Sequence, residues 1–156
     1  MYHGFFRWCR VNTELTRRLI APAMPLRLLD TNIASAAIRG HRAIDARLCA
    51  LPAGGWCISA VTRAELRFGV ERRTHALQLA RLVDAFLMVA QAVPWDGAAA
   101  DAHGRLRAQL EAAGTRIGDF DEMIAAHALA LGAVLVTDNT RHFRRVRGLE
   151  LENWLR

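Results

Sequence analysis

Short apolar runs of strand length recur along the chain, and this recurrence constrains the fold more than any other feature. The runs cover residues 26–29, 56–58, 92–95, 133–136 and 148–151. Helical patterns fill the stretches between the runs, at residues 33–38, 43–51, 60–71, 75–90, 96–114 and 119–131. Strands that alternate with helices favour a parallel sheet covered on both faces. We therefore predict an α/β protein, a three-layer α/β/α domain with a central, mostly parallel sheet of four to five strands.

The size and composition of the chain fit one globular domain. It has 156 residues, of which 53% are hydrophobic, enough for a substantial core. No apolar run approaches the ~20 residues of a membrane span, so we expect no membrane contact. The three cysteines, Cys9, Cys49 and Cys57, show no C-x-x-C spacing. We expect them to be reduced thiols of a cytoplasmic protein rather than zinc ligands.

The net charge is strongly basic and favours a polyanionic partner. It is +6, and all 21 basic residues are arginines, which bind phosphate in a bidentate manner. Residues 1–23 alone carry four arginines against one glutamate, and Met24 directly precedes the first predicted strand. We expect residues 1–23 to form a basic, poorly ordered extension and residues 24–156 to form the functional domain.

Acidic residues follow the predicted strands or begin the helices beside them. Asp30 ends the first apolar run, and Glu65 lies in the helix that opens after the second. Asp121 lies in the first turn of the helix over 119–131, and Asp138 and Asn139 follow the run at 133–136. Because the carboxyl ends of parallel strands meet at one edge of a sheet, we expect these side chains to converge in one acidic pocket.

Such a pocket suits a hard divalent cation. Clustered carboxylates repel one another unless a cation lies between them, and oxygen ligands suit Mg²⁺ or Mn²⁺ rather than Zn²⁺. A metal of this kind can activate water for attack on a phosphodiester. A basic protein with a local acidic pocket is therefore a plausible nuclease, in which arginines hold the nucleic-acid backbone.

Several polar residues near the pocket have competing interpretations. Asp138 and Asn139 compete for one role, because adjacent side chains usually point apart. Thr137 either orients a water or a carboxylate, or closes the turn. We expect Asp119 to cap the helix over 119–131. We also expect His127 and Phe120 to lie on the buried face of that helix, and His142 to be an ordinary surface residue.

Four blocks of the sequence, taken in order, form a recognisable set. They are Leu28-Leu29-Asp30-Thr31-Asn32-Ile33, the stretch over residues 59–70, the stretch over residues 117–128, and the stretch over residues 135–143. Gly148-Leu149 and Glu152-Asn153-Trp154 follow the last block. In order and spacing these blocks resemble PIN-domain toxins of the VapBC class, from about residue 26 to residue 154.

The resemblance implies a PIN-like nuclease domain over residues 24–156 and a Mg²⁺- or Mn²⁺-dependent endoribonuclease. Asp30, Glu65 and Asp121 match the three core acidic positions of the family, so the resemblance assigns them as metal ligands. The fourth acidic position falls on Asn139, beside Asp138, which leaves a second metal open. The resemblance also implies an RNA substrate, often tRNA, a toxin homodimer and a cognate antitoxin that blocks the pocket. Operator DNA would be bound only through the antitoxin, within a toxin–antitoxin hetero-oligomer.

Two other functions remain open at this point. The first is a catalytically weak PIN module that serves as a nucleic-acid-binding or regulatory subunit with an antitoxin. The second is a phosphoryl-transfer hydrolase with Asp30 as nucleophile. Enzymes of that kind usually need a second aspartate two residues on, where this chain has Asn32, so Asn32 is expected to brace the site instead.

Overall fold

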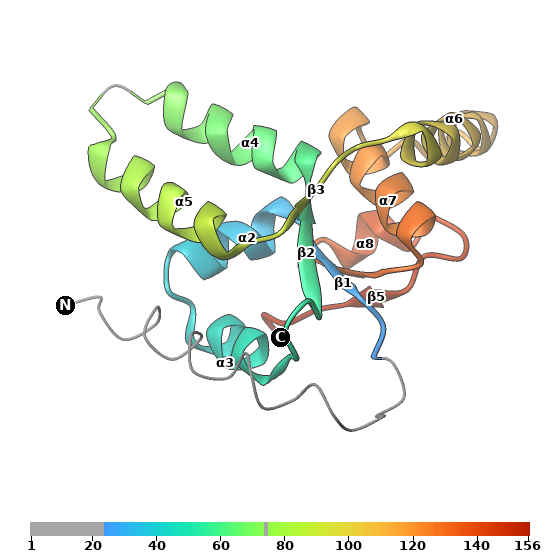
Figure 1. Cartoon of the computed structure of the whole chain (residues 1–156). Coiled ribbons are helices and arrows are strands. Elements are labelled where there is room, and N and C mark those ends of the chain that lie inside the picture. Colours follow the sequence, from blue (N-terminus) through green and yellow to red (C-terminus); the bar gives the residue numbers. More distant parts are fainter. Residues whose placement is uncertain (1–23, 74) are drawn as a thin grey trace.

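A five-stranded parallel sheet forms the centre of the computed structural model, which describes residues 24–73 and 75–156 (Figure 1). Its strands, in chain order, are β1 (Arg27–Leu29), β2 (Trp56–Ser59), β3 (Ala92–Val93), β4 (Val134–Val136) and β5 (Leu151–Glu152). Their order across the sheet is β3-β2-β1-β4-β5, and every neighbouring pair is parallel. Leu29 at the end of β1 aligns with Ile58 on one side and Val136 on the other, so β1 and β4 end level and β2 ends one residue later.

Helices cover both faces of this sheet. They are α2 (Thr31–Ile38), α3 (Arg42–Ala50), α4 (Ala60–Glu71), α5 (Leu77–Val89), α6 (Gly97–Ala112), α7 (Asp119–Leu131) and the short α8 (Thr140–Phe143). Figure 1 shows α4 and α5 side by side on one flank of the molecule, with α6 and α7 on the other. The predicted three-layer α/β/α fold with a parallel sheet is therefore confirmed.

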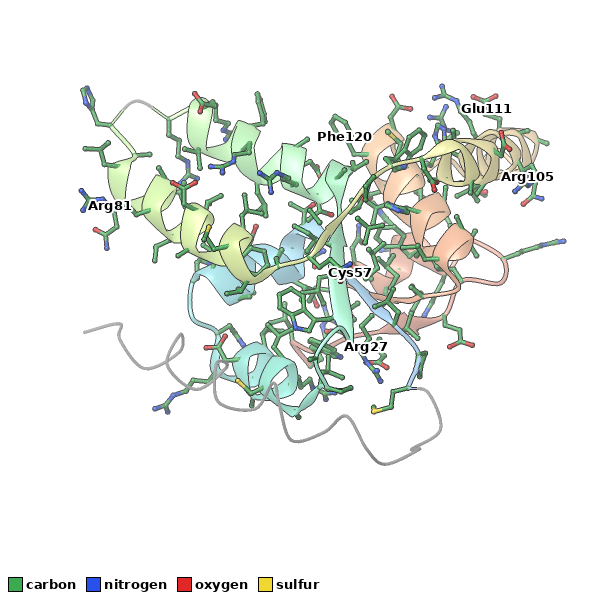
Figure 2. All side chains as sticks on the ribbon, in the orientation of Figure 1. Arg27, Cys57, Arg81, Arg105, Glu111 and Phe120 are labelled. Carbon is green, nitrogen blue, oxygen red and sulfur yellow. The ribbon has the colours of Figure 1, made fainter. Side chains whose placement is uncertain are left out.

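Two hydrophobic cores, one on each face of the sheet, follow from the alternation of side chains along its strands. On β1, Leu28 packs into a core with α6 and α7, whereas Leu29 packs into a core with α2, α3 and α5. Cys57 and Ile58 on β2 divide between the same two cores, and Figure 2 shows Cys57 within the central sheet. Because both faces are buried, consecutive residues at the centre of the sheet are apolar rather than alternating with polar ones, as in Leu28-Leu29, Cys57-Ile58 and Val134–Val136.

Polar side chains fix the points at which helices leave the strands. The Asp30 carboxylate accepts from Thr31 N at the start of α2, and the Ser59 hydroxyl accepts from Val61 N at the start of α4. The predicted cap at Asp119 is wrong, because Gly118 is the N-cap of α7 and Asp119 lies in the first turn. Gly118 has φ +110°, a conformation that side chains disfavour, so a glycine rather than an aspartate occupies the cap.

Other sequence predictions differ from the structure at exposed ends. Phe120, expected on the buried face of α7, is 57% exposed at the outer end of that helix (Figure 2). The last strand lies at Leu151–Glu152 rather than at 148–151, because Gly148 turns the chain with φ +77°. The extension predicted for residues 1–23 lies outside the described residues, so it stays a prediction, together with the domain boundary at residue 24. In the described part of the chain, no helix is both long and apolar enough to cross a membrane.

Candidate active site

Asp30 lies at the carboxyl end of the central strand and is almost completely buried, with 4% of its surface exposed. Its Oδ1 accepts from Thr31 N at 2.7 Å. Its Oδ2 accepts from Asn32 Nδ2 at 2.7 Å and from the Thr137 hydroxyl at 2.7 Å. Asp30 therefore caps α2 and also stands in a network that joins β1 to the loop after β4.

Asn32 and Thr137 hold this network together, as the sequence predicted for Asn32. The Asn32 amide donates to Thr137 Oγ1 at 3.2 Å as well as to Asp30, and its Oδ1 accepts from Asp138 N at 3.1 Å. Thr137 is fully buried and also accepts from Asn139 N at 3.0 Å. Thr137 therefore both orients the Asp30 carboxylate and closes the turn, so its two interpretations are compatible.

Asp138 and Asn139 have different surroundings. Asp138 Oδ1 accepts from Asn153 Nδ2 at 3.0 Å and lies 3.4 Å from Arg156 Nε, so its carboxylate is held by residues that follow β5. The Asn139 side chain makes no hydrogen bond to any residue that the structure describes. Of the two neighbours, Asn139 therefore has the side chain that is available to a ligand.

Glu65 and Asp121 are placed by helices α4 and α7. The Thr31 hydroxyl donates to Glu65 Oε2 at 2.5 Å, which ties α4 to the first turn of α2. Asp121 lies in the first turn of α7, and its Oδ2 is 3.8 Å from His142 Nδ1. His142 was expected to be an ordinary surface residue, but α8 brings it beside Asp121. Sequence reasoning missed this contact because no local pattern pairs α8 with α7.

The pKa of Asp30 indicates that the charges of Glu65 and Asp121 reach this carboxylate. Burial raises the pKa of Asp30 from 3.8 to about 6, and the hydrogen bonds from Thr137 and Thr31 lower it in part. The charges of Asp121 and Glu65 raise it further. Burial also raises the pKa of Asp121, while His142 lowers it. Three acidic groups from β1, α4 and α7 therefore share one electrostatic environment at the carboxyl edge of the sheet.

The chemistry of these donors suits a divalent cation. Neighbouring carboxylates repel one another and are stabilised by a positive charge placed between them, and oxygen ligands are those that hard cations prefer. Within residues 24–73 and 75–156, however, no three His, Cys, Asp or Glu side chains are already arranged to hold a metal ion. Glu65 is held by the Thr31 hydroxyl, and two oxygens of Asp30 already accept hydrogen bonds. The donor types fit a metal, although the ligands are not preassembled.

A buried histidine ties the two outer acidic helices together. His127 on α7 is 1% exposed, and its Nδ1 lies 2.9 Å from the hydroxyl of Ser59, the residue that caps α4. Burial lowers the pKa of His127, with partial compensation from Asp96. The prediction of a core histidine is confirmed. Its bond also fixes the start of the helix that carries Glu65 relative to the helix that carries Asp121.

Glu122, next to Asp121, is a fully buried carboxylate that sequence reasoning did not single out. Its Oε1 accepts from Arg116 Nε at 2.5 Å and from Ile117 N at 3.3 Å. Its charge contributes to the raised pKa of Asp121. The available signal was the helical period, which places residue 122 on the same face as the buried Ala125 and Ala126. Glu122 anchors the loop before α7 and thereby the position of Asp121.

Comparisons with known proteins show which family this chain resembles. The PIN domain family model matches residues 27–149. A tRNA(fMet)-specific endonuclease VapC from Shigella flexneri is 39% identical over 127 residues, which cover 81% of this chain and 96% of that protein. Ribonuclease VapC2 of Rickettsia felis is 36% identical over 129 residues, with 81% and 96% covered.

A solved structure supports the same assignment. The DNA-bound VapBC complex from Salmonella typhimurium contains a chain that superposes with a TM-score of 0.79 at 35% identity, covering 84% of this chain and 99% of that one. The matched region includes every candidate site residue from Asp30 to Asn139. PIN-domain ribonucleases generally depend on a divalent metal. The chain belongs to the PIN domain family and, within it, to the VapC ribonucleases.

Proposed function

We propose that this protein is the toxin of a type II toxin–antitoxin pair and acts as a Mg²⁺- or Mn²⁺-dependent endoribonuclease. The observation that carries the proposal is the buried carboxylate of Asp30 at the carboxyl end of the central strand, with Glu65 and Asp121 near enough for their charges to raise its pKa. The names of its relatives, an endonuclease and a ribonuclease, support the same activity.

In this proposal Asp30, Glu65 and Asp121 hold the cation. When bound, a divalent metal lowers the pKa of a coordinated water and stabilises negative charge on a phosphodiester. Asn32 and Thr137 hold the Asp30 carboxylate, and Thr31 holds Glu65, through the bonds described above. The raised pKa of Asp30, about 6, implies that metal binding strengthens as the pH rises through this value, because a ligand must lose its proton.

The reaction is hydrolysis of one RNA phosphodiester. The water oxygen forms a bond to phosphorus, the bond from phosphorus to the 3′ oxygen breaks, and the departing 3′ oxygen takes up a proton. The products carry a 5′-phosphate and a 3′-hydroxyl. The Asn139 amide, which is free in the described structure, is suited to donate to a phosphate oxygen.

Nothing favours Asp30 as a covalent nucleophile. Its Oδ2 accepts two hydrogen bonds and its Oδ1 accepts one, and these bonds hold the carboxylate in place. Position 32 is an asparagine that braces Asp30, where a phosphoryl-transfer enzyme of that kind would need a second acid.

The relatives also suggest the substrate and the partners. The Shigella flexneri relative is named for tRNA(fMet), which makes initiator tRNA the first RNA to test. The Salmonella typhimurium structure is a VapBC complex bound to DNA. For this chain we infer a cognate antitoxin, a toxin homodimer within a hetero-oligomer, and operator DNA bound only through the antitoxin.

The test is cleavage of initiator tRNA by the purified protein, with EDTA and after Mg²⁺ or Mn²⁺ is restored. The matched variants are Asp30→Asn and Asp101→Asn, since Asp101 is an exposed aspartate on α6, away from the site. We expect metal-dependent cleavage by the native protein and by Asp101→Asn, and none by Asp30→Asn. Mg²⁺ should also raise the Tm of the native protein but not that of Asp30→Asn.

Cleavage that survives both EDTA and Asp30→Asn would refute the metal–carboxylate mechanism. RNA binding without cleavage under every metal condition would favour the catalytically weak module instead. Growth arrest on expression, relieved by the gene encoded next to this one, is the expected sign of a toxin.

A further inference from the structure

A pocket of about 580 Å³ lies beyond the catalytic acids, against α8 and β5. Pockets of about 300–1,000 Å³ accommodate small ligands, so this one has room for a nucleotide. Its polar lining residues are Thr140, Arg144, Asn153 and Arg156. Its apolar lining includes Val146, which is buried, and Leu149, which is half-buried. The pocket therefore joins positive charge to an apolar wall.

Among the residues that line the pocket, Arg144 has the positive charge that is most accessible to an anionic ligand. In the part of the chain that the structure describes, no carboxylate or carbonyl contacts its guanidinium. Arg156 is less available, because it lies 3.4 Å from Asp138, although its side chain is 79% exposed. A guanidinium without a partner, beside the Thr140 hydroxyl, is a favourable ligand for a phosphate group.

The segment from residue 137 to residue 144 contributes both to this pocket and to the catalytic acids. Thr137 donates to Asp30, whereas its neighbour Asp138 accepts from the pocket residue Asn153. On α8, His142 lies beside Asp121, while Thr140 lines the pocket. An RNA strand bound at the acidic residues would therefore lie next to this pocket, because the same short segment contributes to both.

The lining favours a nucleotide over a bare anion. An inorganic phosphate would gain nothing from the apolar contacts at Val146 and Leu149, whereas the face of a nucleobase would. The surrounding segment is also basic, because Arg141, Arg145 and Arg147 accompany Arg144 between residues 141 and 147. This charge suits the backbone of an RNA strand.

We propose that this pocket binds one nucleotide of the RNA strand adjacent to the cleaved phosphodiester, with its phosphate on Arg144 and its base against Val146 and Leu149. The proposal rests on the ribonuclease function proposed above and adds to it a binding subsite for substrate. It also assigns one of the arginines of this basic chain, Arg144, to a specific phosphate of the substrate.

The test compares Arg144→Gln with Arg147→Gln. Both variants remove one charge from the same exposed segment, but Arg147 is outside the pocket. Binding of a fluorescent single-stranded RNA is measured by anisotropy in the Asp30→Asn background, at several salt concentrations. We expect Arg144→Gln to raise Kd about tenfold and to reduce the slope of log K against log salt by about one. Arg147→Gln should change Kd less than about twofold.

Kinetics in the otherwise native protein and an abasic scan complete the test. Arg144→Gln should raise KM by a larger factor than it lowers kcat, and Arg147→Gln should do neither. In an RNA with one abasic nucleotide moved along the strand, a single position next to the cut should weaken binding. That loss should be smaller in Arg144→Gln, because phosphate and base occupy the same pocket.

Equal effects of the two arginine variants on Kd would overturn the proposal, because they would show only a non-specific electrostatic attraction between this basic segment and RNA. If the native protein cleaves RNA while both variants retain its KM, the subsite is refuted and the ribonuclease function stands. If no RNA is cleaved but only Arg144→Gln loses RNA binding, the ribonuclease function is refuted, and binding of a nucleotide in this pocket is supported without it.

Discussion

Asp30→Asn is expected to stabilise the metal-free protein at neutral pH, although it should abolish cleavage. The reason is the burial of an ionised carboxylate beside two other acids. The pKa of Asp30 rises from 3.8 to about 6 on folding, so the folded protein binds the proton more tightly than the unfolded chain does. At about 1.4 kcal/mol per pH unit, ionised Asp30 costs the folded protein roughly 3 kcal/mol above pH 6.

The asparagine removes this cost but loses one hydrogen bond. Its NH₂ group must replace either Oδ1, which accepts from Thr31 N, or Oδ2, which accepts from both Asn32 and Thr137. The Oδ1 position loses only one acceptor, at a cost of about 1 kcal/mol. We therefore expect a net gain of about 2 kcal/mol at neutral pH, or roughly 4–8 °C in Tm.

The sign of the effect should change with pH. The native protein is most stable with Asp30 protonated, below about pH 4, and loses this stability as the pH rises through the folded-state pKa of about 6. Asp30→Asn has no such titration. It should be less stable than the native protein by about 1 kcal/mol near pH 3 and more stable by about 2 kcal/mol near pH 7.5.

Urea unfolding in EDTA across this pH range is the measurement, with Asp101→Asn, a change at an exposed aspartate, as the control. EDTA is essential, because a bound cation would stabilise the ionised form. A variant that is less stable than the native protein at pH 7.5, or a stability difference independent of pH, would refute the argument that burial and the neighbouring acids destabilise ionised Asp30.

Three further variants test how the site is held. Thr31→Val, which removes the hydroxyl that donates to the glutamate of α4, should weaken metal affinity about tenfold by calorimetry, whereas serine at this position should preserve it. Ser59→Ala removes both a helix cap and a hydrogen bond to the buried histidine of α7, so it should lower the free energy of unfolding in urea by about 2 kcal/mol. Asp96→Ala, which removes the cap of α6, should lower it by about 1 kcal/mol. Arg116→Gln leaves a fully buried glutamate without its cation and should lower Tm more than Arg107→Gln, which breaks exposed pairs only; equal Tm values would contradict this.

The sheet and the order of its helices could be predicted because they depend on local patterns. Apolar runs mark strands that are buried on both faces, as in β4, and Ser59 marks the start of α4 through its own hydrogen bond. The prediction was wrong where the conformation of one glycine decided the outcome. Gly118, rather than Asp119, is the N-cap of α7. Gly148 turns the chain, so the last strand begins at Leu151 rather than at residue 148.

The proximity of Glu65 and Asp121 to Asp30 could also be predicted, since Asp30 ends a strand, Asp121 begins a helix and Glu65 lies in a helix that leaves the same edge of the sheet. Their partners could not. His142 lies beside Asp121 only because α8 packs near α7, and Glu122 has a cation partner only because Arg116 folds back from the preceding loop. These contacts join segments with no shared sequence pattern, so they require the tertiary arrangement.

The two interpretations of Asp30, helix cap and catalytic acid, turn out to depend on each other. Its cap bond to Thr31 and its bond from Thr137 stabilise the ionised form and lower its pKa, while burial and the other acids raise it. Without those bonds the carboxylate would hold its proton to a still higher pH and be a poorer metal ligand. The cap bond thus keeps a buried acid ionisable near neutral pH, so the residue that begins α2 is also suited to hold a cation.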